Sequence, residues 1–282
     1  MALPILHDWD SYFDNHHEGL GSSYERIILN KLLLNLKRRY KFTSVLEAPC
    51  FGFTGISGLN SIVLSRSGCR VTLLDNDPRR VERIRQIHQD LNADIEVQSI
   101  SSYHQLPFTD RAFDFSWNFS ALWFVDDLTA FLAELNRVTA KAILLCVPNR
   151  QGIGYKWQKA HSDIPAGLVF NEQNIDLELL KSEMNKLNWV LIREDYIDCP
   201  PWPDIGMSKE KFLGGYLSRV KVNKFNDKPS KQVSIMDFYR GKDSKFAKRM
   251  LKYSILENHA PTCFKKLWSH HFWMLFEPST HK

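Results

Sequence analysis

The sequence predicts an α/β fold: a doubly wound, seven-stranded, mostly parallel sheet with helices on both of its faces. Apolar segments of strand length alternate with segments whose apolar residues recur with the helical period. Three glycines, Gly52, Gly55 and Gly58, follow the first of these strands and indicate a tight loop. A chain of 282 residues with 44% hydrophobic residues is large enough to bury the core of such a sheet.

A helix is expected before the first strand. Ser22-Ser-Tyr-Glu25 has the form of a capping box, which predicts that the helix begins there. It closes on Lys37, Arg38 and Arg39, where cations interact favourably with the helix dipole. Its apolar positions are Ile27, Ile28, Leu32, Leu33 and Leu36.

Seven strands follow, with helices between them. The expected strands are residues 43–50, 70–77, 94–100, 113–122, 141–149, 189–197 and 270–278. Gly68 is placed to end the helix after the glycine loop in a left-handed conformation. Asp77 is expected to cap the next helix with Pro78 in its first turn, and Asp126-Asp127 to cap the helix after strand four.

We expect four parts along the chain. Residues 1–42 form an N-terminal helical cap, and residues 43–204 form the body of the sheet with its helices. Residues 205–268 form a helical insertion between strands six and seven, which is long enough to act as a lid. Residues 269–282 return as the final strand. Nothing in the sequence fixes the oligomeric state.

Composition excludes several classes of protein. The N-terminus lacks the basic start and apolar run of a secretory signal, and the apolar runs fall far short of the roughly 18 residues of a membrane helix. These features predict a soluble, cytoplasmic protein. The five cysteines have no paired spacing, so neither a disulfide scaffold nor a metal site is predicted. His270-His271 is interpreted as a core or strand-end pair.

The glycine loop fits two kinds of cofactor. Gly52-x-x-Gly55-x-x-Gly58 is similar to the loop of extended short-chain dehydrogenases, and Tyr155-x-x-x-Lys159 matches the catalytic pair of that family. However, five residues separate the first strand from the glycines here. The serine that such a pair needs would fall near Ala142, where the sequence has none. A nicotinamide cofactor is therefore disfavoured.

Five segments in the same order resemble class I S-adenosylmethionine-dependent methyltransferases. They are "VLEAPCFGFTG", "VTLLDNDP", "LPFTDRAFDFSW", "ALWFVDDLTAFLAELNRV" and "AILLCVPN". The resemblance covers about residues 43–150 and is closest to the small-molecule group that includes ubiquinone and menaquinone biosynthesis enzymes. It implies a Rossmann-like fold and S-adenosylmethionine as the cofactor. Pro49 stands where the family usually has its first glycine.

The resemblance and the chemistry of the cofactor together predict its contacts. Glu47, at the end of strand one, suits the ammonium and sulfonium charges, and Asp75, at the end of strand two, suits the ribose diol. Ser101 and Ser102 stand where the family often has an acid for the adenine amino group, and Asn118 follows strand four. The full set of expected cofactor contacts is Glu47, Ala48, Pro49, Gly52, Asp75, Asn76, Ser101, Ser102 and Asn118.

The expected reaction is in-line methyl transfer to a small or lipid-like metabolite of apolar or aromatic character. Aromatic residues are frequent in the N-terminal segment and the insertion, which indicates an acceptor enclosed away from water. Catalysis then depends mainly on holding the acceptor close and aligned. Tyr12, Tyr24 and His16 are the candidates for a catalytic residue, and ordinary packing is the competing interpretation for the two tyrosines.

Two other functions remain open. Thirteen Lys or Arg residues against four acids between Lys209 and Lys252 fit an RNA methyltransferase, although such charge runs are more often solvated helix faces, and the net charge is only +5. The proline at position 49 and the missing adenine-side acid fit a degenerate methyltransferase fold that serves as a binding module.

Overall fold

The computed structural model describes residues 9–16, 18–52, 55–161, 170–203 and 235–279. A seven-stranded sheet runs through it in the order β3-β2-β1-β4-β5-β7-β6. The strands are β1 (Ser44–Glu47), β2 (Arg70–Asp75), β3 (Ile95–Ser99), β4 (Phe113–Phe119), β5 (Thr139–Pro148), β6 (Trp189–Ile197) and β7 (His271–Pro278). All pairs are parallel except those of β7, which runs antiparallel to both β5 and β6. The predicted fold class is confirmed.

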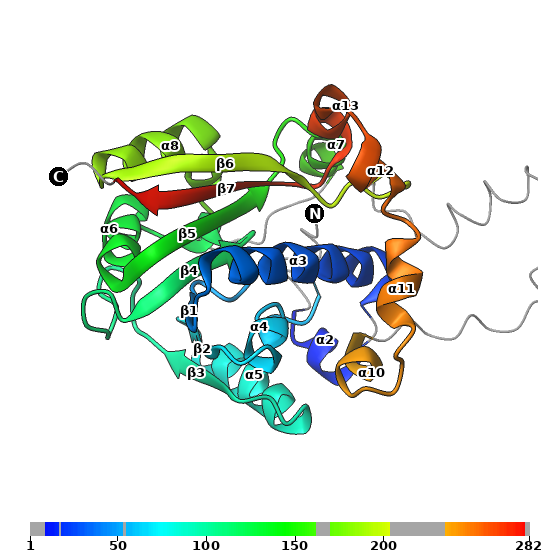
Figure 1. Cartoon of the computed structure of the whole chain (residues 1–282), viewed down its shortest axis with the longest axis horizontal. Coiled ribbons are helices and arrows are strands. Elements are labelled where there is room, and N and C mark those ends of the chain that lie inside the picture. Colours follow the sequence, from blue (N-terminus) through cyan, green and yellow to red (C-terminus); the bar gives the residue numbers. More distant parts are fainter. Residues whose placement is uncertain (1–8, 17, 53–54, 162–169, 204–234, 280–282) are drawn as a thin grey trace, which may run out of the picture.

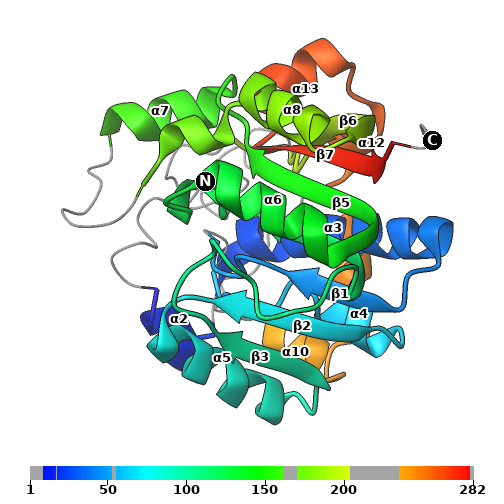
Figure 2. The same ribbon diagram turned by 90° about the vertical axis from the view of Figure 1, so that its left-hand side faces the viewer.

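Helices lie on both faces of this sheet. They are α2 (Ser11–Asp14), α3 (Gly19–Tyr40), α4 (Ile62–Arg66), α5 (Pro78–Asp90), α6 (Leu128–Val138), α7 (Ile153–His161), α8 (Leu177–Lys186), α10 (Ile235–Tyr239), α11 (Phe246–Leu251), α12 (Ile255–His259) and α13 (Thr262–Trp268). Short 3₁₀ turns form at Leu122–Phe124 and Glu172–Ile175. Figure 1 shows α3 crossing one face of the sheet above α4 and α5, with α10 and α11 beside its N-terminal half. Figure 2 shows α6 and α8 on the other face.

The sheet has one hydrophobic core on each of its two faces, because successive side chains of a strand point to opposite faces. Val45, Leu73 and Trp117 belong to the core under α3, α4 and α5. Leu46 and Leu74, one residue away from the first two, belong to the core under α6 and α8. The uninterrupted apolar strands of the sequence are therefore buried on both faces, as a parallel sheet requires.

Three of the expected helix signals are confirmed. Asp77 accepts a hydrogen bond from the Arg79 amide, with Pro78 in the first turn of α5. Asp127 accepts from the Ala130 amide and caps α6. Gly68 follows α4 with a φ of +89°, in the left-handed region.

The expected start of the N-terminal helix is wrong. α3 begins at Gly19, so Ser22 lies inside its first turn rather than at its N-cap. The cause is tertiary: Glu18, just before the helix, is buried and binds Arg26 eight residues later, about two turns along the helix, which extends the helix backwards. A local capping pattern carries no information about such a partner.

Of the expected insertion, the structure describes residues 235–268, which form α10 to α13. Residues 204–234, including the first half of the basic stretch, lie outside the described residues. Within the described part of the chain, no helix combines the length and the apolar character needed to span a bilayer.

Candidate functional site

Five strand ends meet at one edge of the sheet and carry polar side chains. β1 ends at Glu47, β2 at Asp75, and β4 one residue after Asn118. β6 ends just before Asp198, and antiparallel β7 begins at His271, which pairs with Ile197. In an open α/β sheet, ligands bind beyond the carboxyl ends of the parallel strands, so this edge is the candidate site.

Glu47 is buried at this edge and belongs to a short chain of hydrogen bonds. The Ser61 hydroxyl donates to Glu47 Oε2 at 2.6 Å, and the Trp117 indole donates to Ser61 Oγ at 3.0 Å. Burial raises the pKa of Glu47 to about 8, against the opposing effects of Ser61 and Arg26. A cation bound beside this carboxyl group would favour its ionised form.

The loop after β1 is held tightly against its neighbours. The Ala48 amide donates to the Trp117 carbonyl at 3.0 Å, and the Cys50 amide donates to the Leu74 carbonyl at 2.9 Å. A Cβ atom on Gly52 would lie 2.4 Å from the Phe119 carbonyl oxygen, so only glycine fits here. Pro49, in the position expected to contact the cofactor, is buried between these anchors.

Arg26 of α3 holds the second part of the loop, at Ile56 and Asn60. Its guanidinium binds the Glu18 carboxylate at 2.7 and 2.5 Å and donates to Asn60 Oδ1 and the Ile56 carbonyl, both at 2.5 Å. Glu18 Oε1 also accepts from the Ile56 amide at 2.7 Å. Sequence reasoning missed this clamp, because Ile56 and Asn60 of the loop lie 30 and 34 residues from Arg26 and no local pattern joins them.

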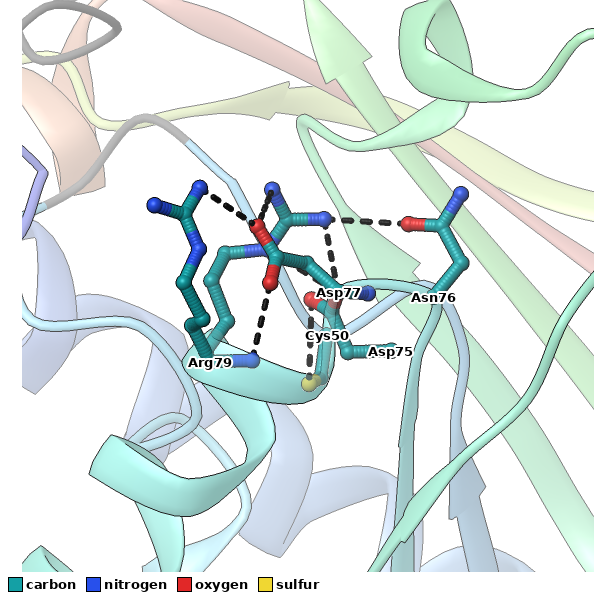
Figure 3. A network of polar contacts seen from close by, with 6 residues as sticks. Cys50, Asp75, Asn76, Asp77 and Arg79 are labelled. Atoms are coloured by element: carbon teal, nitrogen blue, oxygen red, sulfur yellow. Dashed lines mark hydrogen bonds and ion pairs between the residues drawn. The ribbon is translucent and has the colours of Figure 1, made fainter.

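Asp75 is wholly buried, and Arg80 binds its carboxylate. Arg80 Nε and one terminal nitrogen donate to Asp75 Oδ1 at 2.9 and 2.6 Å, and the Asp77 amide donates at 2.8 Å. Cys50 Sγ lies 4.0 Å from the other oxygen (Figure 3). The Arg80 guanidinium carbon lies 4.1 Å from the centre of the Phe51 ring. Burial raises the pKa of Asp75, although Arg80 acts to lower it.

The polar side chains expected beside Asp75 are close to it in the fold. Asn76 is exposed, and its Oδ1 accepts from Arg80 at 3.0 Å. Ser101 is exposed and Ser102 half-buried, with the Ser102 hydroxyl accepting from the His104 amide at 3.1 Å. Ser101 and Ser102 follow β3, which pairs with β2 through Asp75 and Ser99, so these serines border the same edge.

Asn118 is the most unusual of the expected residues. Its side chain is fully buried, yet neither its Oδ1 nor its Nδ2 has a hydrogen-bond partner among the residues that the structure describes. Buried amides are nearly always paired, because burying an unpaired polar group costs about 1–3 kcal/mol. This unpaired amide near the end of β4 makes Asn118 a candidate ligand contact.

The three catalytic candidates have different surroundings. Tyr12 packs at the margin of the core under α3, and His16 is half-exposed beyond α2. Tyr24 is fully buried with its hydroxyl unpartnered, and its ring packs edge-on against Trp202 at 5.6 Å. Burial, helped by nearby acids, raises the pKa of Tyr24 far above its ordinary value, so it stays protonated.

Tyr155 and Lys159, the two residues of the dehydrogenase alternative, both contact the same glutamate. The Tyr155 hydroxyl and the Lys159 ammonium both donate to Glu172, at 2.5 and 2.7 Å. The pair is therefore explained as part of a structural contact between α7 and the Glu172–Ile175 turn. In the described half of the basic stretch, Arg249 pairs with Asp243 on the surface.

Comparison with known proteins agrees with this geometry. Residues 53–146 match the family model of a methyltransferase domain. No curated protein matches the chain. The fold is similar to that of a protein proposed to be a sarcosine dimethylglycine methyltransferase from Galdieria sulphuraria, with 16% identity, 89% of this chain and 85% of that chain covered, and a TM-score of 0.51.

Two further structures show how widely this fold is used. A complex between the Haloferax volcanii Trm112 methyltransferase activator and its proposed methyltransferase matches with 13% identity, 96% and 97% coverage and a TM-score of 0.51. The [4+2]-cyclase SpnF matches with 13% identity, 89% and 81% coverage and a TM-score of 0.50. The chain thus has the fold of S-adenosylmethionine-dependent methyltransferases, and its matched domain supports assignment to that class of enzyme.

Proposed function

We propose that this protein transfers the methyl group of S-adenosylmethionine to a small or lipid-like metabolite of apolar or aromatic character. The observation that carries the proposal is the orphaned amide of Asn118 beside two strand-end carboxyl groups, Glu47 and Asp75. The matched methyltransferase domain supports the choice of cofactor.

The residues at the strand ends fit the chemical groups of this cofactor. Glu47 offers a carboxyl group for positive charge, and a cation beside it would offset the cost of ionising it in a buried position. Asp75 can accept from a ribose diol. Asn118 has a free donor and a free acceptor. Gly52 leaves no side chain where the loop meets β4.

S-adenosylmethionine, when bound, supplies an electrophilic methyl group next to a positively charged sulfur. The chain itself must position the methyl donor and the acceptor and exclude water, because in-line transfer depends on the alignment of donor and acceptor. Glu47 and Asn118 would hold the charged end, and the clamp of Arg26 on the loop keeps them in place. Tyr24, which stays protonated, is suited to donate a hydrogen bond rather than to act as a base.

Arg80 sets a condition on cofactor binding. Asp75 accepts from Arg80, so a ribose diol that binds Asp75 must compete with this guanidinium. An alcohol is a weaker donor than a cation, and the exchange therefore lowers the affinity for the cofactor. We expect binding weaker than in a site whose ribose-binding acid is free.

The aromatic side chains near this edge support an apolar or aromatic acceptor. Phe51 contacts both Trp9 and Phe124, with ring centres 6.4 and 5.2 Å apart. Trp202 packs between Tyr24 and Tyr253. Phe51, Trp202 and Tyr24 are buried core residues, so an acceptor bound next to them would meet apolar rather than charged side chains.

Cofactor binding is tested by calorimetry with S-adenosylmethionine and S-adenosylhomocysteine. We expect one site per chain, and at least a tenfold loss of affinity in Glu47→Gln and in Asp75→Asn. Asp90→Asn, an exposed acid at the end of α5, is the matched control and should bind like the wild type. An absence of heat and of any thermal shift at millimolar ligand would refute the proposal.

The acceptor class is tested by transfer of a tritiated methyl group from the cofactor in a cell extract. We expect label in the organic-soluble fraction of small metabolites and lipids. Label that appears instead in RNA and disappears on ribonuclease treatment would assign the basic stretch a substrate-binding role and overturn the metabolite proposal.

One observation favours a second candidate, a methyltransferase fold that acts as a binding module. The ion pair of Arg80 with Asp75 satisfies the ribose-binding acid internally, which is the arrangement expected where no cofactor binds. The same calorimetry separates the two candidates: binding of either ligand with a dependence on Asp75 supports the enzyme.

A further inference from the structure

Three buried side chains meet at the carboxyl edge of the sheet, on the side away from Asp75. Glu25 comes from α3, Asp198 follows β6, and His271 begins β7. His271 Nδ1 lies 4.0 Å from Glu25 Oε2 and 3.9 Å from Asp198 Oδ2. The three ligand atoms all lie within 4.8 Å of one another, and all three residues are buried. The sequence predicted no metal site, because these residues are spread over more than 240 positions.

Three polar atoms of this cluster have no hydrogen-bond partner among the described residues. They are His271 Nδ1, Glu25 Oε1 and Asp198 Oδ1. The separations of 3.9 and 4.0 Å from His271 Nδ1 to the two carboxylates are too long for hydrogen bonds, whereas the side chains of Glu25 and Asp198 bond to each other. Two neighbouring buried carboxyl groups and an unpaired imidazole nitrogen together demand a charge or a donor between them.

The distances between the three ligand atoms indicate which kind of ion fits between them. A point equidistant from three atoms separated by 3.9, 4.0 and at most 4.8 Å lies no more than about 2.5 Å from each of them. Bonds from Zn²⁺ to imidazole nitrogen and carboxylate oxygen are about 2.0–2.2 Å, so a shift of a few tenths of an ångström completes the coordination. We infer that Glu25, Asp198 and His271 bind one divalent first-row transition-metal ion, Zn²⁺ or Mn²⁺.

The donor set and its surroundings agree with this assignment. One imidazole and two carboxylates suit Zn²⁺ or Mn²⁺ better than Ca²⁺ or Mg²⁺, which prefer oxygen alone. Two carboxylates also match the double charge of the ion. His270 Nδ1 lies 2.6 Å from Asp198 Oδ2, a contact that orients the carboxylate as outer-shell partners do in metal sites. The Phe119 ring covers the His271 ring, with centres 4.5 Å apart.

Two other occupants are less suited to the gap. An organic ammonium group carries at least one carbon substituent, which needs more room than the space between three atoms within 4.8 Å of each other. A proton shared between Glu25 and Asp198 would leave His271 Nδ1 still unpaired. A single ion engages all three groups at once.

The position suggests a use that rests on the proposed function. Phe119, whose ring packs on His271, follows Asn118, so the ion would lie near the end of β4, next to the residue proposed to hold the charged end of the cofactor. A metal ion lowers the pKa of a bound hydroxyl or enol and so prepares it for methylation. Removing the ion should then reduce methyl transfer while leaving the affinity for S-adenosylhomocysteine unchanged.

The site is tested on the full chain, purified without a histidine tag and treated with EDTA. Mn²⁺ and Zn²⁺ are titrated separately by calorimetry, without any cofactor, so that the result does not depend on methyl transfer. We expect one ion per chain, an increase in Tm, and at least a tenfold weaker affinity in Glu25→Gln and Asp198→Asn. Glu183→Gln, a buried glutamate on α8, is the matched control and should bind as the wild type does.

X-ray absorption at the metal edge of the wild-type protein covers the case in which the variants fail to fold. We expect one imidazole nitrogen, with oxygen atoms as the other ligands. The inference is overturned if neither ion binds below millimolar concentration, if affinity is equal in the folded Glu25 and Asp198 variants, or if the absorption spectrum lacks the imidazole.

Discussion

At the scale of single residues, Asn118 is the clearest sign of a ligand. The chain buries this amide at the end of β4 and gives it no partner. Asn174, by comparison, is also buried, with 8% of its surface exposed against 0% for Asn118, but its Nδ2 donates to the carbonyls of Leu122 and Val125 at 3.1 and 2.7 Å. The first amide therefore costs the free protein stability, while the second contributes to it.

This contrast predicts opposite effects of the same substitution. Asn118→Leu should leave the free energy of unfolding unchanged or raise it by about 1 kcal/mol, because it removes an unpaired polar group. Asn174→Leu should lower it by about 1–3 kcal/mol. Only Asn118→Leu should also weaken binding of S-adenosylhomocysteine. Denaturant unfolding and calorimetry measure both effects, and a large loss of stability in Asn118→Leu would show that its amide is already satisfied.

Glu47 predicts a pH dependence of stability. Its pKa is about 8 in the folded protein, because the carboxyl group is buried, and near 4.5 when the chain is unfolded. Between these values the folded state holds a proton that the unfolded state has lost, so the free energy of unfolding falls as the pH rises. The slope contributed by this one group is at most about 1.4 kcal/mol per pH unit.

Glu47→Gln is expected to remove this contribution. Between pH 5 and 8, the variant should lose less stability than the wild type, and above pH 8 it should be the more stable of the two. Denaturant unfolding at several pH values measures the difference, with Glu183→Gln as the control. Parallel curves for wild type and Glu47→Gln would mean that Glu47 is ionised in the free protein.

At the scale of elements, the loop after β1 depends on helix α3. Arg26 and Glu18 bind each other and reach the loop through Ile56 and Asn60. Both charged groups are removed from water, so losing one leaves the other buried and unpaired, at a cost of about 3–5 kcal/mol. The helix therefore does more than cover the sheet: it sets the shape of the loop that carries the candidate site.

Arg26→Met is expected to destabilise the protein by about 3–5 kcal/mol and to weaken cofactor binding as the loop loosens. Arg38→Met, on the exposed face of the same helix, should change stability by less than about 0.5 kcal/mol. Thermal unfolding with and without S-adenosylhomocysteine distinguishes the two variants. A mild Arg26→Met would mean that the loop holds its shape without the clamp.

The elements themselves were largely predictable from the sequence. Each of the seven strands was expected within a few residues, because runs such as "AILLCV" have the length and uniform apolarity of strands buried on both faces. Caps with a local chemical signature, Asp77 and Asp127, were also found. The true start of α3 was not, because Glu18 is held by a tertiary partner.

The candidate site was predictable only as far as strand ends determine it. Glu47 and Asp75 could be named because each ends a recognisable strand, whereas Asn118 lies inside β4, one residue before its end, and not after it as expected. The ion pair of Arg80 with Asp75 was not predicted. The available signal was a basic residue five positions after the strand-end acid, close enough to reach it across the first turn of α5. The Glu25, Asp198 and His271 cluster is brought together by topology alone.

At the scale of the whole molecule, one edge of the sheet gathers two groups of functional side chains. β1, β2 and β4 end in the groups proposed for the cofactor, and β6 and β7 meet at the groups proposed for a metal ion. Of these strands only β5 lies between the two groups in the strand order. We propose that the methyl acceptor binds between the two groups, reached by the donor from one side and by the ion from the other.

The most direct test of the central claim is a crystal structure of the protein with S-adenosylhomocysteine at a saturating concentration. We expect the ligand across the ends of β1 and β2, with its ribose on the Asp75 carboxylate, the Arg80 guanidinium moved away from that carboxylate, and Asn118 hydrogen-bonded for the first time. A ligand bound elsewhere, or an Asp75–Arg80 ion pair and an Asn118 amide unchanged beside bound ligand, would contradict the account.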